Sequence, residues 1–150
     1  MIIDEIDRKI LVELKENGKQ SLRELAKKVN LSSPSVTERV RRMESEGIIK
    51  GYTIDIDYKK LGYGVDCIIE VTLRSGDYEK FRKKISEYPK AEFCYRIAGQ
   101  ACYLVKLRLK SLDEIEEFIN EITAYAGTVT HIVLSTVEIK WNVLERREDK

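Results

Sequence analysis

The stretch from Ser21 to Ile49, SLRELAKKVNLSSPSVTERVRRMESEGII, decides the fold of the N-terminal part of the chain, because it predicts two helices joined by a tight turn. Ser21 and Glu24 form an S-x-x-E capping box, which starts a helix by satisfying free backbone amides. Asn30 tolerates the left-handed backbone of a tight turn. Leu31 follows as the buried anchor of that turn.

The second helix of this stretch has its own start and stop signals. Ser33 as N-cap and Pro34 at the first helical position predict its beginning. Gly47 predicts its end, with Ile48 folding back on Met43 as in a Schellman motif. Two short helices around a turn of this kind are typical of a helix-turn-helix.

The outward face of the second helix carries polar and basic side chains. At roughly 100° per residue, Val36, Val40 and Met43 point inward. Hydroxyl side chains crowd the N-terminal end, which enters the major groove in this motif, and two arginines follow. We expect direct DNA contacts from Ser32, Ser33, Ser35, Thr37, Glu38, Arg41 and Arg42. Phosphate contacts are expected from Lys19, Gln20, Arg23 and Lys28.

Basic charge is concentrated on this unit. From Lys19 to Arg42 there are seven basic and two acidic residues, whereas Met1 to Gly18 has three basic and five acidic residues. The net charge of the chain is only +1, so a nucleic-acid footprint must be local. Arg39 suits a salt bridge to Glu44 or a phosphate contact equally. A solvated helix face remains the alternative for Lys27 and Lys28.

Three segments are expected along the chain. Residues 1–50 form the DNA-binding domain, which begins with a helix from Asp4, its N-cap, to Asn17. Residues 51–64 form a linker, with a strand from Gly51 to Asp57 and then a glycine-containing hinge. Residues 65–150 form the second domain.

The second domain alternates strands and helices in the order βαββαβ, the ferredoxin-like arrangement. Its strands are expected at residues 65–74, 91–97, 102–109 and 128–143. One helix begins at Gly76-Asp77, and the other begins at a capping box formed by Ser111 and Glu114. Both helices pack on one sheet face, so the bare second face predicts dimerisation. The fold class is therefore α+β, a winged-helix-like helix-turn-helix followed by a ferredoxin-like domain.

Composition narrows the remaining possibilities. Cys67, Cys94 and Cys102 are odd in number and lack C-x-x-C spacing, so we expect reduced thiols in a cytoplasmic protein. His131 is the single histidine, which argues against multi-histidine metal sites and catalytic triads. We expect no catalytic site, metal, cofactor, signal peptide or membrane association.

These residues give the chain a family resemblance. It resembles the Lrp/AsnC (leucine-responsive, feast/famine) transcriptional regulators in IDEIDRKIL at Ile3 to Leu11, SLRELA at Ser21 to Ala26, and the whole stretch from Leu31 to Tyr52. Weaker marks are Ile97-Ala98-Gly99 and the closing IVLSTVEIK. The resemblance implies a DNA-binding domain joined to an effector and assembly domain. It also implies dimers, often octamers, that respond to amino acids bound at subunit junctions.

The effector expectation rests on the turn after Ile97-Ala98-Gly99. In the family this segment usually carries an acidic residue that holds the effector's amino group, whereas here it is Gln100-Ala101-Cys102. A small amino acid is expected between dimers at Gly99, Gln100, Ala101, Cys102, Leu134, Ser135 and Thr136. The alternative is a plain hairpin turn with no ligand.

The sequence therefore predicts a sequence-specific transcription regulator that binds double-stranded DNA as a dimer or octamer, on a roughly palindromic operator. Two alternatives belong to other functional classes. One is an enzyme or stand-alone metabolite-binding module, against which stands the lack of a nucleophile–base pair or a nucleotide fingerprint. The other is an architectural protein that coats DNA with little sequence preference.

Overall fold

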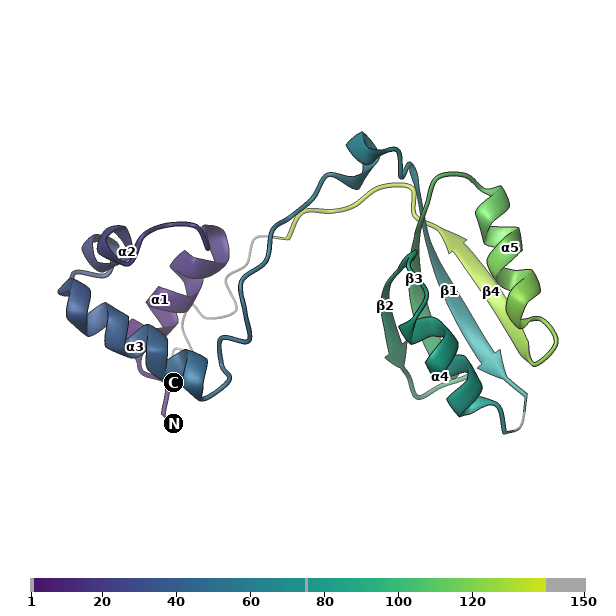
Figure 1. The fold of residues 1–150 in the computed structure, drawn as a ribbon, viewed down its shortest axis with the longest axis horizontal. Helices are drawn as coiled ribbons and strands as arrows, with labels where there is room; N and C mark the ends of the chain where they lie inside the picture. Colours follow the sequence, from purple (N-terminus) through teal and green to yellow (C-terminus); the bar gives the residue numbers. More distant parts are fainter. Residues whose placement is uncertain (1, 75, 140–150) are drawn as a thin grey trace, which may run out of the picture. The chain divides into compact units, whose positions relative to one another are not determined.

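The computed structural model describes residues 2–74 and 76–139, which fall into two compact units (Figure 1). The N-terminal unit extends to Asp55, and the C-terminal unit spans Ile56–Val137. Among the described residues, no helix is long and apolar enough to cross a membrane.

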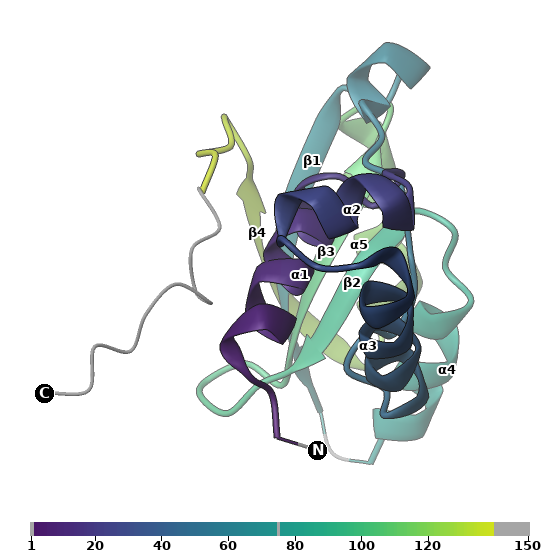
Figure 2. The same ribbon diagram turned by 90° about the vertical axis from the view of Figure 1, so that its left-hand side faces the viewer.

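Three helices make up the N-terminal unit, α1 (Glu5–Glu16), α2 (Leu22–Lys28) and α3 (Ser33–Ser45), and Figure 2 looks onto them. They surround a small apolar core, as the sequence predicted, in which the inward stripes of the helices meet. The fully or almost fully buried members are Ile10, Leu25, Ala26, Val36, Val40 and Met43.

The helix ends follow local hydrogen bonding. Ser21 and Glu24 form the expected capping box on α2. Gly47 has the left-handed φ of 70°, and the Ile48 amide donates to the Met43 carbonyl at 2.9 Å, which confirms the Schellman motif. The prediction of Ser33 as N-cap of α3 was wrong. Ser32 is the N-cap, because its backbone is extended and its hydroxyl accepts from the Ser35 amide.

The C-terminal unit has the predicted βαββαβ order. A 3₁₀ turn, η1 (Tyr58–Leu61), leads into β1 (Val65–Leu73), α4 (Tyr78–Ser86), β2 (Ala91–Arg96), β3 (Tyr103–Leu109), α5 (Asp113–Ile122) and β4 (Ala126–Ile132). The four strands form one antiparallel sheet in the order β2-β3-β1-β4, and α4 and α5 cover one face of it (Figure 1). Alternate residues of β1 and β3 point into the core beneath these helices: Cys67, Ile69, Val71, Leu73, Tyr103, Val105, Leu107 and Leu109.

Two expectations about strands were wrong. Residues 51–57 form no strand, and Ile54 is 78% exposed. The final strand ends at Ile132, well before the expected Val143. Its partner β1 begins at Val65, and the last bond between the two segments runs from the Val133 amide to the Asp66 carbonyl. Residues 140–143 of the expected strand lie outside the described part of the chain.

The expected Ser111–Glu114 capping box is also absent. Helix α5 starts at Asp113 without a side-chain cap. The Glu114 carboxylate instead accepts from the Lys110 amide at 2.9 Å and pairs with Lys90 at 3.2 Å. The Glu114 carboxylate therefore binds these two donors and does not cap the start of α5.

Apart from Tyr58 of η1, whose ring centre lies 3.4 Å from the Arg108 guanidinium, no described element of the C-terminal unit covers the second sheet face. Its apolar side chains are Ile68, Phe93, Tyr95, Leu104 and Val129, and charged side chains lie beside them. Lys106 and Arg108 pair there with Asp66 and Glu92, the closest contacts being 2.7 and 2.8 Å to Glu92.

Candidate nucleic-acid interface

The turn between α2 and α3 fixes how the second helix is presented. Asn30 takes a φ of 55°, the left-handed conformation that was predicted for it. The Leu31 amide then donates to the Ala26 carbonyl at 3.0 Å, and the Leu31 side chain packs against the helical core. This turn redirects the chain between α2 and α3 and leaves the polar face of α3 exposed to solvent.

That polar face carries the side chains predicted to read DNA. Five of them are exposed, Ser32, Ser35, Glu38, Arg41 and Arg42, and two are half-buried, Ser33 and Thr37. The hydroxyls already have local partners, since the Ser32 and Ser35 oxygens lie 2.8 Å apart and Thr37 donates to the Ser33 carbonyl at 2.8 Å. Thr37 is therefore left with acceptor capacity only, which suits an amino group on a base edge.

The cations around α3 divide into two groups. Within residues 2–74, Lys19, Arg23 and Arg41 have no carboxylate within ion-pair distance, and all three are exposed. Lys28 is engaged, because its ammonium lies 2.6 Å from the Glu13 carboxylate on α1. The unpaired cations are the ones that can bind phosphates without losing a contact within the protein.

An ion cluster ties α1 to α3. The Asp7 carboxylate is fully buried and lies 2.8 Å from the Arg39 guanidinium and 3.2 Å from that of Arg42. Arg39 also lies 2.6 Å from Asp4. The Asp7 amide and the Arg39 guanidinium together lower the pKa of the Asp4 carboxyl, and the two carboxylates raise the pKa of Arg39.

Arg39 is thus structural, although its partner differs from the expected Glu44. Glu44 instead accepts a hydrogen bond from the Tyr52 hydroxyl at 2.8 Å. Partial desolvation of Tyr52, which stays 55% exposed, and this bond raise the pKa of Tyr52 to about 12. Tyr52 therefore fastens the segment after α3 to α3 itself.

A hollow of about 310 Å³ lies beside this contact and is lined by Gln20, Thr37, Arg41, Glu44 and Tyr52, among others. Gln20 donates from its side-chain amide to the Glu13 carbonyl at 2.8 Å. Its Oε1 atom is buried and has no hydrogen-bond partner among the described residues. The structure therefore gathers three of the predicted DNA-binding residues, Gln20, Thr37 and Arg41, around one hollow.

The predicted effector residues separate into two groups in the C-terminal unit. Gly99, Gln100, Ala101 and Cys102 form the connection between β2 and β3, where the Cys102 amide donates to the Val71 carbonyl. Leu134, Ser135 and Thr136 follow β4 beyond the opposite end of the sheet, next to the bond from Val133 to Asp66. Since Val71 and Asp66 lie five residues apart on β1, about 16 Å of strand separates the two groups. The two groups of predicted effector residues are therefore not adjacent within one chain.

Comparison with known proteins identifies both units. A family model described as a winged helix-turn-helix DNA-binding domain matches residues 3–50, and a model of the Lrp/AsnC ligand binding domain matches residues 66–140. The chain belongs to the Lrp/AsnC family. It is thus a helix-turn-helix transcriptional regulator that carries an Lrp/AsnC ligand-binding domain.

Its relatives in this family match along almost their whole length. The HTH-type transcriptional regulator LrpC of Bacillus subtilis is 52% identical over 140 residues, which are 93% of this chain and 97% of that protein. The solved LrpC structure has a TM-score of 0.90 and covers 93% of this chain and 100% of its own. FL11 of Pyrococcus horikoshii is 36% identical, over 89% of this chain and 91% of that protein. The regulator NMB0573 of Neisseria meningitidis, solved as an L-Met complex, shares the fold with a TM-score of 0.87 at 23% identity, over 92% of this chain and 94% of its own.

Two residues of this Lrp/AsnC chain with a part in the site were missed from sequence. Asp7 was passed over, although Asp4-x-x-Asp7 is itself a capping-box spacing, and both reciprocal bonds are present at 2.8 and 3.2 Å. Tyr52 was assigned to an isolated strand. No periodic pattern identifies its bond to Glu44, because that bond depends on the path of the chain after α3.

Proposed function

We propose that this protein reads a specific DNA sequence through the exposed face of α3. The proposal rests on one surface of α3, which combines short hydroxyl side chains at the helix start with Arg41 further along. Among the residues described in this unit, Arg41 forms no ion pair. Unpaired Lys19 and Arg23 flank the same motif and supply phosphate contacts. Glu38, also exposed, accepts from a cytosine amino group in this arrangement.

The regulator acts as a dimer formed through the open sheet face. That face combines apolar side chains with a charged network, which suits a second copy of the same sheet. Two-fold symmetry presents two reading helices roughly 34–36 Å apart, one turn of DNA, so the operator is roughly palindromic. Association of dimers into an octamer is the further assembly that the family resemblance implies.

A small amino acid bound at a subunit junction regulates the assembly. The two groups of candidate residues, Gly99–Cys102 and Leu134–Thr136, lie at opposite ends of one sheet, so a site that uses both requires two copies of the chain. A ligand shared in this way favours the assembled state and thereby changes DNA occupancy. L-Met, present in the solved complex of the Neisseria regulator that shares this fold, is the first compound for binding assays.

The protein works in the cytoplasm and catalyses no reaction. Its described cysteines, Cys67, Cys94 and Cys102, are unpaired thiols, as in a reducing compartment. A role without catalysis is supported by the relatives, which are named as transcriptional regulators.

The test is a gel-shift titration of the protein on its own promoter DNA with the double variant Arg41→Ala/Arg42→Ala. We expect affinity for the promoter to fall at least about tenfold with retained folding, because two charge-assisted contacts are lost. Lys83→Ala, which removes one exposed cation from α4 in the other unit, is the control and should leave affinity unchanged. Unchanged binding by the double variant would rule out α3 as the reading helix.

A further inference from the structure

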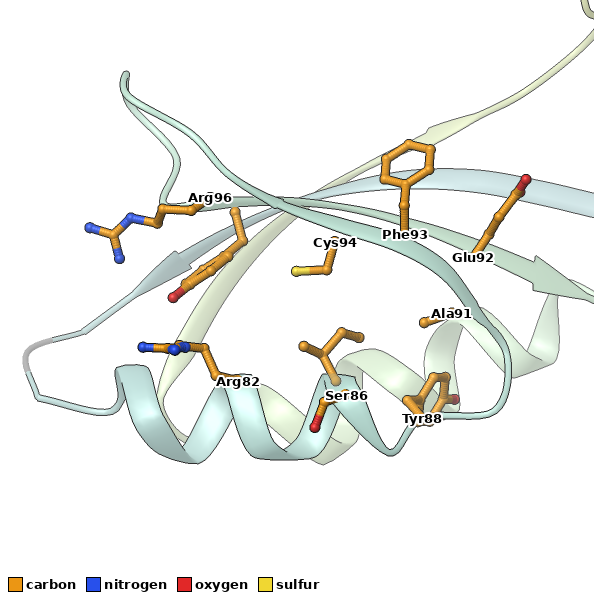
Figure 3. A pocket seen from close by; sticks show the side chains of 10 residues that line it. Arg82, Ser86, Tyr88, Ala91, Glu92, Phe93, Cys94 and Arg96 are labelled. Carbon is orange, nitrogen blue, oxygen red and sulfur yellow. The ribbon is translucent and has the colours of Figure 1, made fainter. Parts of the chain in front are cut away.

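A second hollow, separate from the reading helix, lies in the C-terminal unit between α4 and the edge strand β2 (Figure 3). It is an open groove of about 670 Å³, in the size range of small-molecule sites. Ile85 and Tyr103, both almost fully buried, form part of its floor, and Cys94 points into it from β2. Burial raises the pKa of the Cys94 thiol, so this wall is uncharged.

Two arginines lie at one end of this groove. Arg82 comes from α4 and Arg96 from the end of β2, and their side chains extend at the same end while Tyr88 lies at the other (Figure 3). Arg96 is held by two aromatic rings, with its guanidinium 4.4 Å from the Tyr78 ring centre and 5.2 Å from that of Tyr103. Neither Arg82 nor Arg96 has a carboxylate within ion-pair distance in residues 2–74 and 76–139.

The groove offers no counterpart for a bound cation. Glu92 is the one acidic residue among those that line the groove. It lies between Ala91 and Phe93, where a register irregularity interrupts the pairing of β2 with β3. The Glu92 carboxylate points away from the groove with Phe93 (Figure 3) and is already paired with Lys106 and Arg108. An ammonium group in the groove would therefore meet two guanidiniums and no unpaired carboxylate.

We propose that this groove binds a small carboxylic acid that lacks an ammonium group, with its carboxylate between Arg82 and Arg96 and its apolar body along Ile85 and Cys94. Guanidinium pairs match the geometry of a carboxylate, and the apolar floor accounts for the rest of the ligand. The site is complete within one chain, unlike the proposed amino-acid site at subunit junctions. It also does not rest on DNA binding, so either proposal can fail without the other.

The experiment is a methyl-labelled NMR titration of the full-length protein that follows the Ile85 methyl signal. Three probes share a six-carbon body: hexanoate, the neutral hexan-1-ol, and norleucine, which adds an ammonium group. Hexanoate is expected to shift the Ile85 signal saturably, with an affinity at least about tenfold higher than either other probe. Norleucine binding as tightly as hexanoate would contradict the proposal, and so would an Ile85 signal that hexanoate does not shift.

Variants locate the carboxylate. Arg82→Ala/Arg96→Ala should weaken hexanoate binding at least about tenfold, and Arg82→Ala alone, at an exposed position that the fold does not need, should weaken it severalfold. Lys83→Ala, the neighbouring exposed cation on α4 that does not line the groove, should leave it unchanged. Equal losses from Arg82→Ala and Lys83→Ala would mean non-specific attraction and overturn the site. Promoter affinity of the arginine variants, measured in parallel, should stay at the wild-type value.

Discussion

Arg41 and Arg42 are neighbours on α3, and the structure gives them different surroundings. Arg42 contacts the buried Asp7 carboxylate at 3.2 Å, whereas Arg41 has no ion-pair partner in the described part of its unit. In the free protein Arg41 is therefore available to bind DNA. Arg42 can bind DNA only by sharing its guanidinium with Asp7 or by giving up that ion pair.

This difference predicts distinct effects for the two single variants. Arg41→Ala should lower DNA affinity and reduce the slope of log affinity against log salt by about 1, with no change in thermal stability. Arg42→Ala should lower DNA affinity and also the melting temperature, because Asp7 loses one of its two guanidiniums. Gel shifts at several salt concentrations, together with thermal melts, check both. A melting temperature that falls equally in the two variants would contradict the assignment.

The three thiols are expected to react at different pH. The Tyr78 hydroxyl, 3.5 Å from Sγ, and Arg96 lower the pKa of Cys102, whereas burial raises that of Cys94 and raises that of Cys67 to about 11. A lowered pKa means that thiolate is present at lower pH, so Cys102 should be alkylated first as pH rises. Iodoacetamide labelling at stepped pH, read by peptide mass spectrometry, checks the order. Tyr78→Phe should shift the Cys102 profile to higher pH, and labelling of Cys67 ahead of Cys102 would contradict the assignment.

At the scale of elements, the cluster of Asp4, Asp7, Arg39 and Arg42 fixes α1 against the reading helix. Asp7 is the one buried charged residue in the described core and serves twice, in the capping box of α1 and as partner of both arginines. A buried carboxylate with two guanidinium partners is costly to remove, although both arginines keep partial solvent contact.

Asp7→Asn should therefore lower the free energy of unfolding of the N-terminal unit by about 2 kcal/mol. Urea unfolding followed through this unit measures the change. Glu5→Gln, which removes an exposed carboxylate paired with Lys9 at 3.4 Å on the same helix, is a matched control expected within about 0.5 kcal/mol of the wild type. No difference between the two variants would show that the cluster does not stabilise α1 against α3.

The elements that were predictable from sequence are those fixed by local hydrogen bonds and by burial. Ser21, Glu24, Asn30 and Gly47 act within a few residues of themselves, so their motifs determined the turn and the helix ends. The even alternation of β1 and β3 likewise follows from one buried face.

Long-range partners were not predictable. The Ser111–Glu114 motif failed because Lys90 and the Lys110 amide took the Glu114 carboxylate. The alternation at residues 51–57 indicated a strand, yet no described strand pairs with it. Arg39 was expected to pair with Glu44 or to contact a phosphate. Its ion pairs with Asp4 and Asp7 depend on how α1 packs on α3, which the sequence pattern does not show.

For the whole molecule, the open sheet face predicts the site of dimerisation. Val129 on β4 is 53% exposed in the single chain and lies opposite Glu70 on that face. Val129→Lys should leave the chain folded and convert the dimer to monomer, because it replaces an apolar side chain of the interface with a charge that must be desolvated. Sedimentation velocity at micromolar concentration measures this. Leu112→Lys, an exposed apolar position just before α5, is the control and should remain dimeric. A dimeric Val129→Lys variant would place the interface elsewhere.

Sequence-specific reading of DNA by paired α3 helices is the property on which the proposed function depends. The most direct measurement is selection of bound sequences from a random double-stranded DNA library by the purified full-length protein at fixed salt. Enrichment of two inverted half-sites with centres about 10 bp apart is the predicted result, and Arg41→Ala should weaken this enrichment. Recovery of unenriched DNA, with equal affinity for all sequences, would contradict sequence-specific reading and identify an architectural DNA-binding protein instead.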